Sequence, residues 1–448
     1  MKASLPKWTK RLIGRTTGWS PSKHAEGKGP GDKSKASSKP SALPSWFASN
    51  HGVQVPATEL PIGLYQSWIP EHTDALVHSL VSEDEYVLAD LRILKDVESK
   101  AKRVEALRFA AKYPETYRRM VMHKLSPYKN QAKFLIATFD WQPFIRHVVY
   151  AAAQLRIPTV LVPHESVFAK KSMYYTHPVL GINTPACDLI LAWGDLQERI
   201  FLERGYPAER IVKVGAPKFD YTDRIRDAGR RDAVEVLGLD PGKPIATFAV
   251  QPLDSQFDMQ AAREAQNRSI RDLVQTGLEK GYQIIIRTPP SKDQVLASET
   301  IAYIHDSDGA TIDDSSLYLL TPHETIEVSD VLVSVNSTML LEAALSGKIA
   351  VSAKYMEFDQ VWDSLRIPVV RNALEMSDLL DQAGRDPAAI VARYDTQWAA
   401  SAFSAGVFDG RAAERIRAIL SDIGHGRRKV DVGYALTVPF MPEQVPDT

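Results

Sequence analysis

Residues 330–353, with the sequence DVLVSVNSTMLLEAALSGKIAVSA, decide the fold that this chain predicts. The apolar run at 331–335 has the length and composition of a strand that is buried on both faces. Residues 339–345 favour a short helix, and Gly347 is the residue type that ends one. A second apolar strand resumes at 349–351. This succession of strand, helix and strand is the repeating unit of a parallel sheet.

The polar residues between the first strand and the helix predict a binding site. Asn336, Ser337 and Thr338 are types that cap a helix N-terminus. In a parallel sheet such a helix begins at the carboxyl end of a strand, where its free N–H groups attract phosphate. Glu342 follows Thr338 by one helical turn, within reach of a ribose hydroxyl. We therefore expect a site for a nucleotide-sugar here.

Strand-length and helix-length segments alternate twice along the chain. The first series has strands at 134–138, 159–162, 189–192 and 211–214, with helices at 143–155 and 196–204. The second series has strands at 245–250, 283–286, 317–320 and 331–335, with helices at 259–280 and 292–305. Alternation at this spacing is typical of a doubly wound parallel sheet.

We therefore expect an α/β protein with two Rossmann-like domains that face a cleft. The N-terminal domain, which would hold the acceptor, is expected at 45–225, and the C-terminal nucleotide-donor domain at 226–405. A basic low-complexity arm precedes them at 1–44, and a terminal helix and tail follow at 406–448. Ligands of such sheets bind beyond the carboxyl ends of the strands.

Composition narrows the class of protein. Of the 448 residues, 44% are hydrophobic and 24% are charged, as in soluble globular proteins. The one cysteine, Cys187, cannot form an intrachain disulfide, which favours a reducing, cytoplasmic setting. No run approaches the 18 apolar residues of a membrane span, and the N-terminus lacks the apolar core of a secretory signal.

The charge is distributed unevenly along the chain. Residues 1–44 carry ten Lys or Arg and two acidic residues, although the whole chain has a net charge of −1. Leu5, Trp8, Leu12 and Trp19 recur at helical spacing among these cations. Two interpretations stay open: a solvated tail, or an arm that lies on the anionic inner face of the plasma membrane. Nucleic-acid binding is not expected, because the acidic remainder offers no basic face.

Three stretches resemble one group of enzymes. Ser337-Thr338, Glu342-Ala343 and Gly347 are similar to the nucleotide motif of two-domain (GT-B) bacterial glycosyltransferases. The segments at 185–194 (PACDLILAWG) and 214–220 (VGAPKFD) resemble capsule polysaccharide Kdo transferases, polysialyltransferases and CDP-glycerol glycerophosphotransferases.

The resemblance, over residues 130–355, implies a glycosyltransferase of cell-envelope and capsule polysaccharide biosynthesis. Such an enzyme transfers a sugar, or a glycerol-phosphate-like unit, from a nucleotide-activated donor to a surface polysaccharide or glycolipid. It also implies that Ser337 and Thr338 bind the donor phosphates and that Glu342 binds the ribose.

The catalytic candidates follow strands of the N-terminal domain. His164 and Glu165 end the strand at 159–162, where either side chain could remove the proton of an acceptor hydroxyl. The alternative is that His164 caps the next segment and Glu165 is exposed. In the resemblance, His164 and Lys170 match a His…Lys pair of the glycerophosphotransferases. Asp140 is a second candidate base, and an N-cap for the following helix is its alternative role.

The donor side departs from the family pattern at one residue. Arg287 follows a predicted strand and could bind phosphate with two N–H groups. Pro289 stands where the resembling families carry a histidine, and proline offers no donor. Two alternative functions therefore stay open: a non-hydrolysing sugar-nucleotide 2-epimerase, and a catalytically silent binding subunit of a glycan-assembly complex.

The sequence predicts no resident cofactor. No cluster of His, Cys or acidic residues has metal-ligand spacing, so no catalytic metal is expected. Neither a phosphate-binding P-loop nor a convincing dinucleotide fingerprint is present. The expected small-molecule partner is a CMP-, CDP- or UDP-linked donor.

Overall fold

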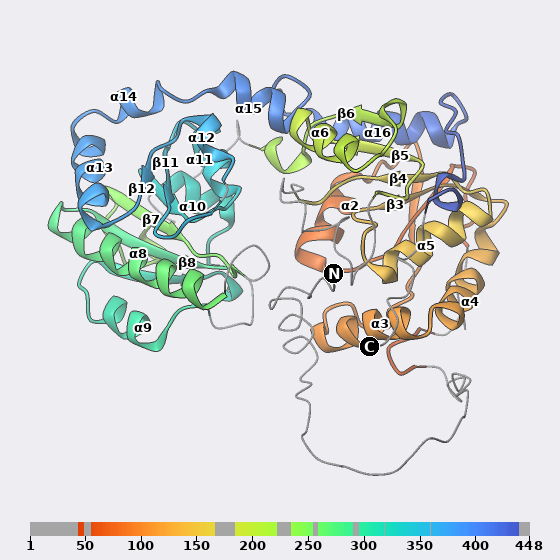
Figure 1. Ribbon diagram of the computed structural model, residues 1–448, viewed down its shortest axis with the longest axis horizontal. Coiled ribbons are helices and arrows are strands. Elements are labelled where there is room, and N and C mark those ends of the chain that lie inside the picture. Colours follow the sequence, from red (N-terminus) through yellow and green to blue (C-terminus); the bar gives the residue numbers. More distant parts are fainter. Residues whose placement is uncertain are drawn as a thin grey trace, which may run out of the picture. The chain divides into compact units, whose positions relative to one another are not determined.

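The computed structural model describes most of the chain (Figure 1). The described residues are 44–48, 55–165, 184–221, 234–253, 259–289, 295–317, 319–358 and 360–438. The chain forms two compact units. The first unit comprises residues 1–214 together with 413–448, and the second unit comprises residues 215–412.

The described part of the first unit contains a six-stranded sheet in the order β2-β1-β3-β4-β5-β6. The strands are β1 (Ile62–Tyr65), β2 (Val87–Asp90), β3 (Ala132–Ala137), β4 (Thr159–Leu161), β5 (Leu189–Ala192) and β6 (Ile211–Lys213). Each pairing is parallel. The helices are α2 (Ala75–Ser79), α3 (Lys100–Lys112), α4 (Pro114–Leu125), α5 (Pro143–Gln154), α6 (Asp195–Glu203) and α16 (Ala412–Gly424).

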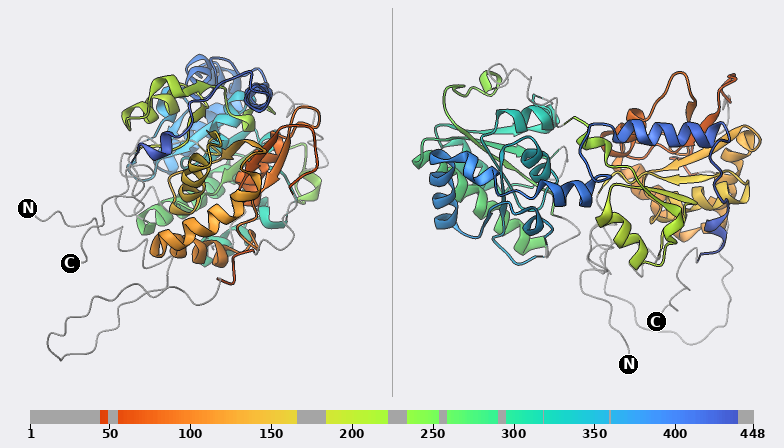
Figure 2. Two further views of the ribbon diagram at one scale, coloured as in Figure 1. Left: turned by 90° about the vertical axis from the view of Figure 1, so that its right-hand side faces the viewer. Right: turned by 90° about the horizontal axis from the view of Figure 1, so that it is seen from above.

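Helices cover both faces of this sheet because alternate strand residues point to opposite sides. Phe134 and Ile136 on β3 form a core with Ile416 and Leu420 on α16 and with residues of α2. Helices α3, α4 and α5 pack on one another, and α5 contacts β3 and β4. In Figure 1 these three helices lie across the sheet from α16, and Figure 2 shows the same layers from two further directions.

The described part of the second unit contains a six-stranded sheet in the order β12-β11-β10-β7-β8-β9, again with parallel pairings only. The strands are β7 (Ile245–Ala249), β8 (Gln283–Thr288), β9 (Ala310–Asp314), β10 (Val331–Ser334), β11 (Ile349–Ala353) and β12 (Val369–Val370). The helices are α8 (Met259–Glu279), α9 (Ser298–His305), α10 (Pro322–Val328), α11 (Met339–Leu345), α12 (Trp362–Leu365), α13 (Ala373–Arg385), α14 (Pro387–Val391) and α15 (Thr396–Phe403).

Local sequence explains where several of these helices begin and end. Thr321 and Glu324 form a reciprocal capping box at the start of α10. Asn372 accepts a hydrogen bond from the backbone N–H of Glu375 at the start of α13. Gly347, with φ of 72°, ends α11 as expected. The two parallel sheets confirm the prediction of two Rossmann-like α/β domains.

One predicted strand is wrong. The described residues of the run at 317–320 form no strand, because Leu317 ends the short helical turn η7 (Ser315–Leu317) and is 64% exposed, and residues 319–320 form a bend. The strand of this region is β9, which is half polar because it lies at the edge of the sheet. Strand β1 was missed, because its sequence IGLY is short and contains a glycine.

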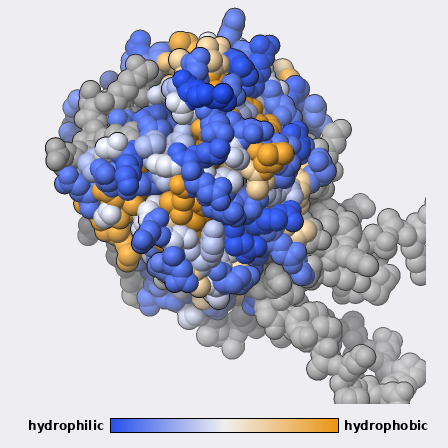
Figure 3. Space-filling model, turned by 90° about the vertical axis from the view of Figure 1, so that its left-hand side faces the viewer, coloured by the Kyte–Doolittle hydropathy of each residue, from blue (hydrophilic) through white to orange (hydrophobic). Residues whose placement is uncertain are grey.

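The outer surface of the second unit shows no large continuous apolar area on the face drawn in Figure 3. Hydrophilic residues dominate this face, with separate small apolar groups between them. No helix among the described residues combines the length and apolarity that crossing a membrane requires.

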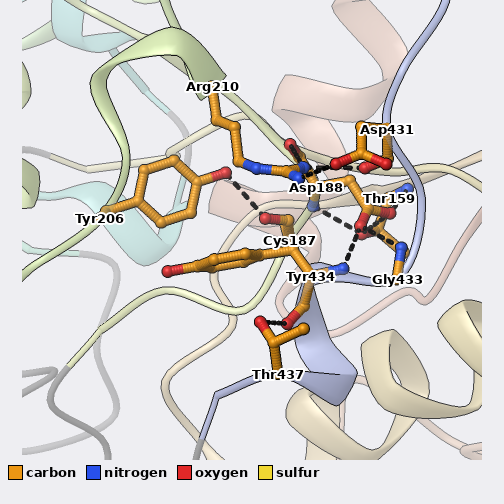
Figure 4. Close-up of polar contacts among 9 residues, drawn as sticks. All are labelled: Thr159, Cys187, Asp188, Tyr206, Arg210, Asp431, Gly433, Tyr434 and Thr437. Atoms are coloured by element: carbon orange, nitrogen blue, oxygen red, sulfur yellow. Dashed lines mark hydrogen bonds and ion pairs between the residues drawn. The ribbon is translucent and has the colours of Figure 1, made fainter.

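The C-terminal segment, residues 427–438, is attached to the first unit through Asp188 (Figure 4). The buried carboxylate of Asp188 accepts from the backbone N–H groups of Gly433 and Tyr434 at 2.7 and 2.9 Å. Its other oxygen accepts from the N–H and hydroxyl of Thr159 on β4. A single carboxylate thus joins the end of the chain to the strand at the middle of the sheet.

Candidate functional site

Each sheet has one position at which the order of its strands reverses. In the first sheet the chain moves from β1 to β2, then resumes at β3 on the other side of β1. In the second sheet β8 and β9 lie on one side of β7, and β10, β11 and β12 lie on the other. Ligands of doubly wound sheets bind beyond the carboxyl ends of the strands at this reversal. The residues that follow β3, β7 and β10 are therefore the first to consider.

In the second unit, three side chains meet where β10 ends. Lys218 Nζ donates to Thr338 Oγ1 at 2.6 Å and lies 3.0 Å from Glu342 Oε1. The Lys218 side chain is 35% exposed, whereas that of Glu342 is 6% exposed. The ammonium of this partly exposed side chain thus contacts a buried carboxylate and a hydroxyl. We call Lys218, Thr338 and Glu342 the lysine cluster.

Ser337 and Thr338 do not cap α11 in the expected way. The N-cap residue is Thr338, but its hydroxyl accepts from Lys218 and makes no cap hydrogen bond. Ser337 Oγ accepts from the backbone N–H of Met339 at 3.2 Å. Next to them, Gln251 after β7 accepts from the N–H of Asn336 at 2.6 Å, which ties the ends of β7 and β10 together.

Arg287 makes its hydrogen bonds to residues outside the lysine cluster. Its guanidinium pairs with the buried carboxylate of Asp313 on β9 and donates to Thr325 Oγ1 and to the carbonyl of Leu320. Strand β8 continues to Thr288, two residues beyond its predicted end, so Arg287 stands opposite Asp313 within the sheet. These contacts give Arg287 a structural role between β8, β9 and α10, and the phosphate contact proposed for it stays a prediction.

In the first unit, His164 lies beside the end of β3. Its Nδ1 is 3.0 Å from the carbonyl oxygen of Thr138, and its ring packs edge-on against Phe139. Because a carbonyl can only accept, this contact places the proton on Nδ1 and leaves Nε2 as the basic nitrogen of the neutral ring. Nε2 is 3.8 Å from Glu165 Oε1. The His164 side chain is 13% exposed and that of Glu165 is 43% exposed, and their predicted role as base stays a prediction.

Asp140 is fully buried and holds a loop. Its Oδ2 accepts from the backbone N–H groups of Ala186 at 2.6 Å and Cys187 at 3.0 Å. The N-cap of α5 is Gln142, so Asp140 does not cap that helix. The contacts support a structural role for Asp140 rather than the predicted role of base. Burial also raises the pKa of the Cys187 thiol, so this cysteine is not an activated nucleophile.

Lys170 lies outside the described residues, so its predicted role stays a prediction. Lys218, in contrast, was not singled out, although it belongs to the segment VGAPKFD that carried part of the resemblance. The available signal in the sequence was a cation two residues after Gly215-Ala216, at the end of a predicted strand. Among the described residues, no three His, Cys, Asp or Glu side chains are grouped so that they could hold a metal ion.

Comparisons with known proteins show the fold. No family model matches the chain, and no curated protein matches it in sequence. A putative UDP-N-acetylglucosamine 2-epimerase from Listeria monocytogenes matches with a TM-score of 0.54 at 10% identity, over 83% of this chain and 100% of that one. The UDP-GlcNAc 2-epimerase of Neisseria meningitidis, solved with UDP-GlcNAc, matches with 0.53 at 10% identity, over 80% and 98%.

The wall teichoic acid polymerase TagF gives a TM-score of 0.49 at 12% identity, over 82% of this chain and 90% of that one. At these identities the likeness extends to the fold alone. The chain has the GT-B-like fold, with two Rossmann-like units, that the sequence predicted.

Proposed function

We propose that this protein is a nucleotide-sugar-dependent glycosyltransferase. It would transfer a sugar, or a glycerol-phosphate-like unit, to a cell-surface polysaccharide or glycolipid. The observation that carries the proposal is the lysine cluster, with Ser337 beside it, at the strand reversal of a GT-B-like second unit. A cation and two hydroxyls at this position suit the phosphates of a nucleotide donor.

The first unit would supply the base. A base must take the proton from the attacking acceptor hydroxyl, and a histidine is the side chain that does so most often near neutral pH. The hydrogen bond from Nδ1 to Thr138 orients the ring and keeps Nε2 available for that proton. Donors on the second unit would stabilise the negative charge that develops on the departing phosphate. The proposal thus assigns one chemical task to each unit.

A second candidate is the non-hydrolysing 2-epimerase. Its support is that the solved structures with TM-scores above 0.5 described above are UDP-GlcNAc 2-epimerases. Such an enzyme would bind the same kind of donor but would need no acceptor. Both candidates therefore share the donor site and differ in what happens to the sugar.

Product analysis separates the candidates. The full-length protein would be incubated with CMP-, CDP-, UDP- and GDP-linked donors, with and without a glycan acceptor. We expect nucleotide release that depends on acceptor. Conversion of the sugar without nucleotide release would establish the epimerase instead, and donor binding without either reaction would refute both enzymatic functions.

A histidine substitution tests the base. His164→Ala should reduce turnover by about two to four orders of magnitude, the usual contribution of general base catalysis, and leave donor affinity nearly unchanged. His78→Ala is the matched control, because His78 is exposed on α2 of the same unit. An unaffected rate in His164→Ala would remove this residue from the mechanism.

A further inference from the structure

The contacts within the lysine cluster indicate that Glu342 has a role other than binding ribose. The Glu342 side chain is 6% exposed, and its carboxylate pairs with Lys218 at 3.0 Å. A carboxylate that binds ribose must expose an oxygen atom to the bound nucleotide, whereas the carboxylate of Glu342 is covered by protein. Among the described residues, Lys218 is the cation that pairs with Glu342. Leaving a buried carboxylate without its partner is costly, so this contact has a structural reason to persist.

Two polar contacts orient the ammonium of Lys218, which also lies over the Phe219 ring, 5.4 Å from its centroid, and one of its N–H groups is used by neither polar contact. Lysine carries three N–H donors. Thr338 Oγ1 accepts one of them, and Glu342 Oε1 faces another. The Lys218 side chain is 35% exposed, so part of it is open to solvent. Its backbone lies in the short turn η5 (Pro217–Phe219), whose proline limits the freedom of the chain there.

The surroundings fit an anion better than a neutral ligand. The ammonium stands at the carboxyl end of β10, next to the strand reversal where a doubly wound sheet binds its ligand. Ser337 offers a further hydroxyl on the adjoining residue. Arg287, the other cation that the sequence reasoning placed on phosphate, is hydrogen-bonded to Asp313 and α10 instead. Of these two cations, Lys218 is the one that lies at the end of β10 and has a partly exposed side chain.

We propose that Lys218 is the phosphate ligand of the donor site and that Glu342 is a positioning residue, which holds Lys218 in place and does not bind the ribose. This inference rests on the proposed function and deepens it. It divides the binding of a nucleotide into two separable parts. The affinity gained from phosphates depends on Lys218 and Glu342, and the preference for ribose over deoxyribose does not depend on Glu342.

Binding of nucleotide fragments tests both parts in the full-length protein. Calorimetry would give Kd values for a nucleoside, its monophosphate, its diphosphate and the 2′- and 3′-deoxy diphosphates, using the base that wild type prefers. Lys218→Met should weaken diphosphate binding by about 10- to 100-fold, as expected for a charge-assisted hydrogen bond. The same substitution should leave nucleoside affinity unchanged.

Glu342→Gln should reduce the affinity that the phosphates add to nucleoside binding. It should leave the preference for ribonucleotides over deoxynucleotides unchanged. Lys280→Met is the matched control, because Lys280 forms a surface pair with Asp381 in the same unit. This control should bind every ligand as wild type does. Circular dichroism would check each variant's fold. If Glu342→Gln does not fold, Thr338→Val still removes one of the two contacts that orient the ammonium.

Three outcomes would overturn the inference. Equal ratios of diphosphate to nucleoside affinity in wild type and Lys218→Met would show that Lys218 does not contact phosphate. Loss of ribose discrimination in Glu342→Gln, with the phosphate gain intact, would make Glu342 the ribose ligand. Absence of any nucleotide binding by wild type would refute the proposed function itself and this inference with it.

Discussion

Replacing Asp188 by alanine should detach the C-terminal segment from the first unit. Asp188 is 1% exposed, and one oxygen of its carboxylate accepts from both Gly433 and Tyr434 (Figure 4). Hydrogen bonds to a charged group contribute about 1.5–3 kcal/mol each, so losing two removes about 3–6 kcal/mol. The segment has further polar contacts, which involve Arg210 with Asp431 and Arg427 with Asp422 and Glu85, and they lie largely at the surface, where an ion pair contributes at most about 1 kcal/mol.

Hydrogen exchange measures this loss directly. A change of 3–6 kcal/mol corresponds to a fall of about 10²- to 10⁴-fold in the protection of the two amides, since 1.4 kcal/mol is a factor of ten. Mass spectrometry of peptides that cover residues 427–438 would report it in wild type and Asp188→Ala. Peptides from α8 in the second unit should exchange as before.

The control for this experiment is Asp431→Ala, which removes a carboxylate from the same segment. The Asp431 side chain is 86% exposed, so its removal should change protection by less than about tenfold. The reasoning is refuted if the Gly433 and Tyr434 amides stay protected in Asp188→Ala. It is also refuted if the two substitutions have equal effects.

Two further predictions concern pH and the N-terminal arm. Burial, with a smaller effect of Arg118, lowers the pKa of His147 from 6.5 to about 3. His147 therefore becomes protonated below about pH 6.5 in the unfolded chain, but only below about pH 3 in the folded protein. Unfolding free energy should thus fall by about 2 kcal/mol between pH 8 and pH 5, and urea titrations of His147→Gln should lack this loss. A parallel pH dependence in the two proteins would contradict the assignment. Deleting residues 1–44 should preserve activity and reduce binding to anionic vesicles, and equal binding by the shortened protein would make the arm a solvated tail.

Sequence patterns predicted the interior of the fold better than its edges. A strand buried on both faces is a continuous apolar run, and LILA at β5 was predicted with its observed bounds because of that. Strand β9 lies at an edge and contains Asp313 and Asp314, so it lacks any such run. Because β9 was not predicted, its contact with Arg287 was not predicted either: Asp313 is the residue with which Arg287 pairs.

The candidate site was predictable only where its residues are close in sequence. Ser337, Thr338 and Glu342 fall within six positions of one another, and local pattern identified all three. Lys218 stands 120 residues before Thr338, so only the folded chain brings them together. The burial of Glu342, which changes its inferred role, is likewise a property of packing that no local pattern contains.

The first unit is assembled from both ends of the polypeptide, and this has a consequence for biosynthesis. Residues 215–412 form a continuous unit that can fold as soon as the ribosome has released it. The first unit must wait for α16 and for the amides that Asp188 binds, which follow the second unit in the chain. Until α16 has been made, its sheet lacks one covering helix, and a nascent chain stalled near residue 412 would expose that apolar surface to chaperones.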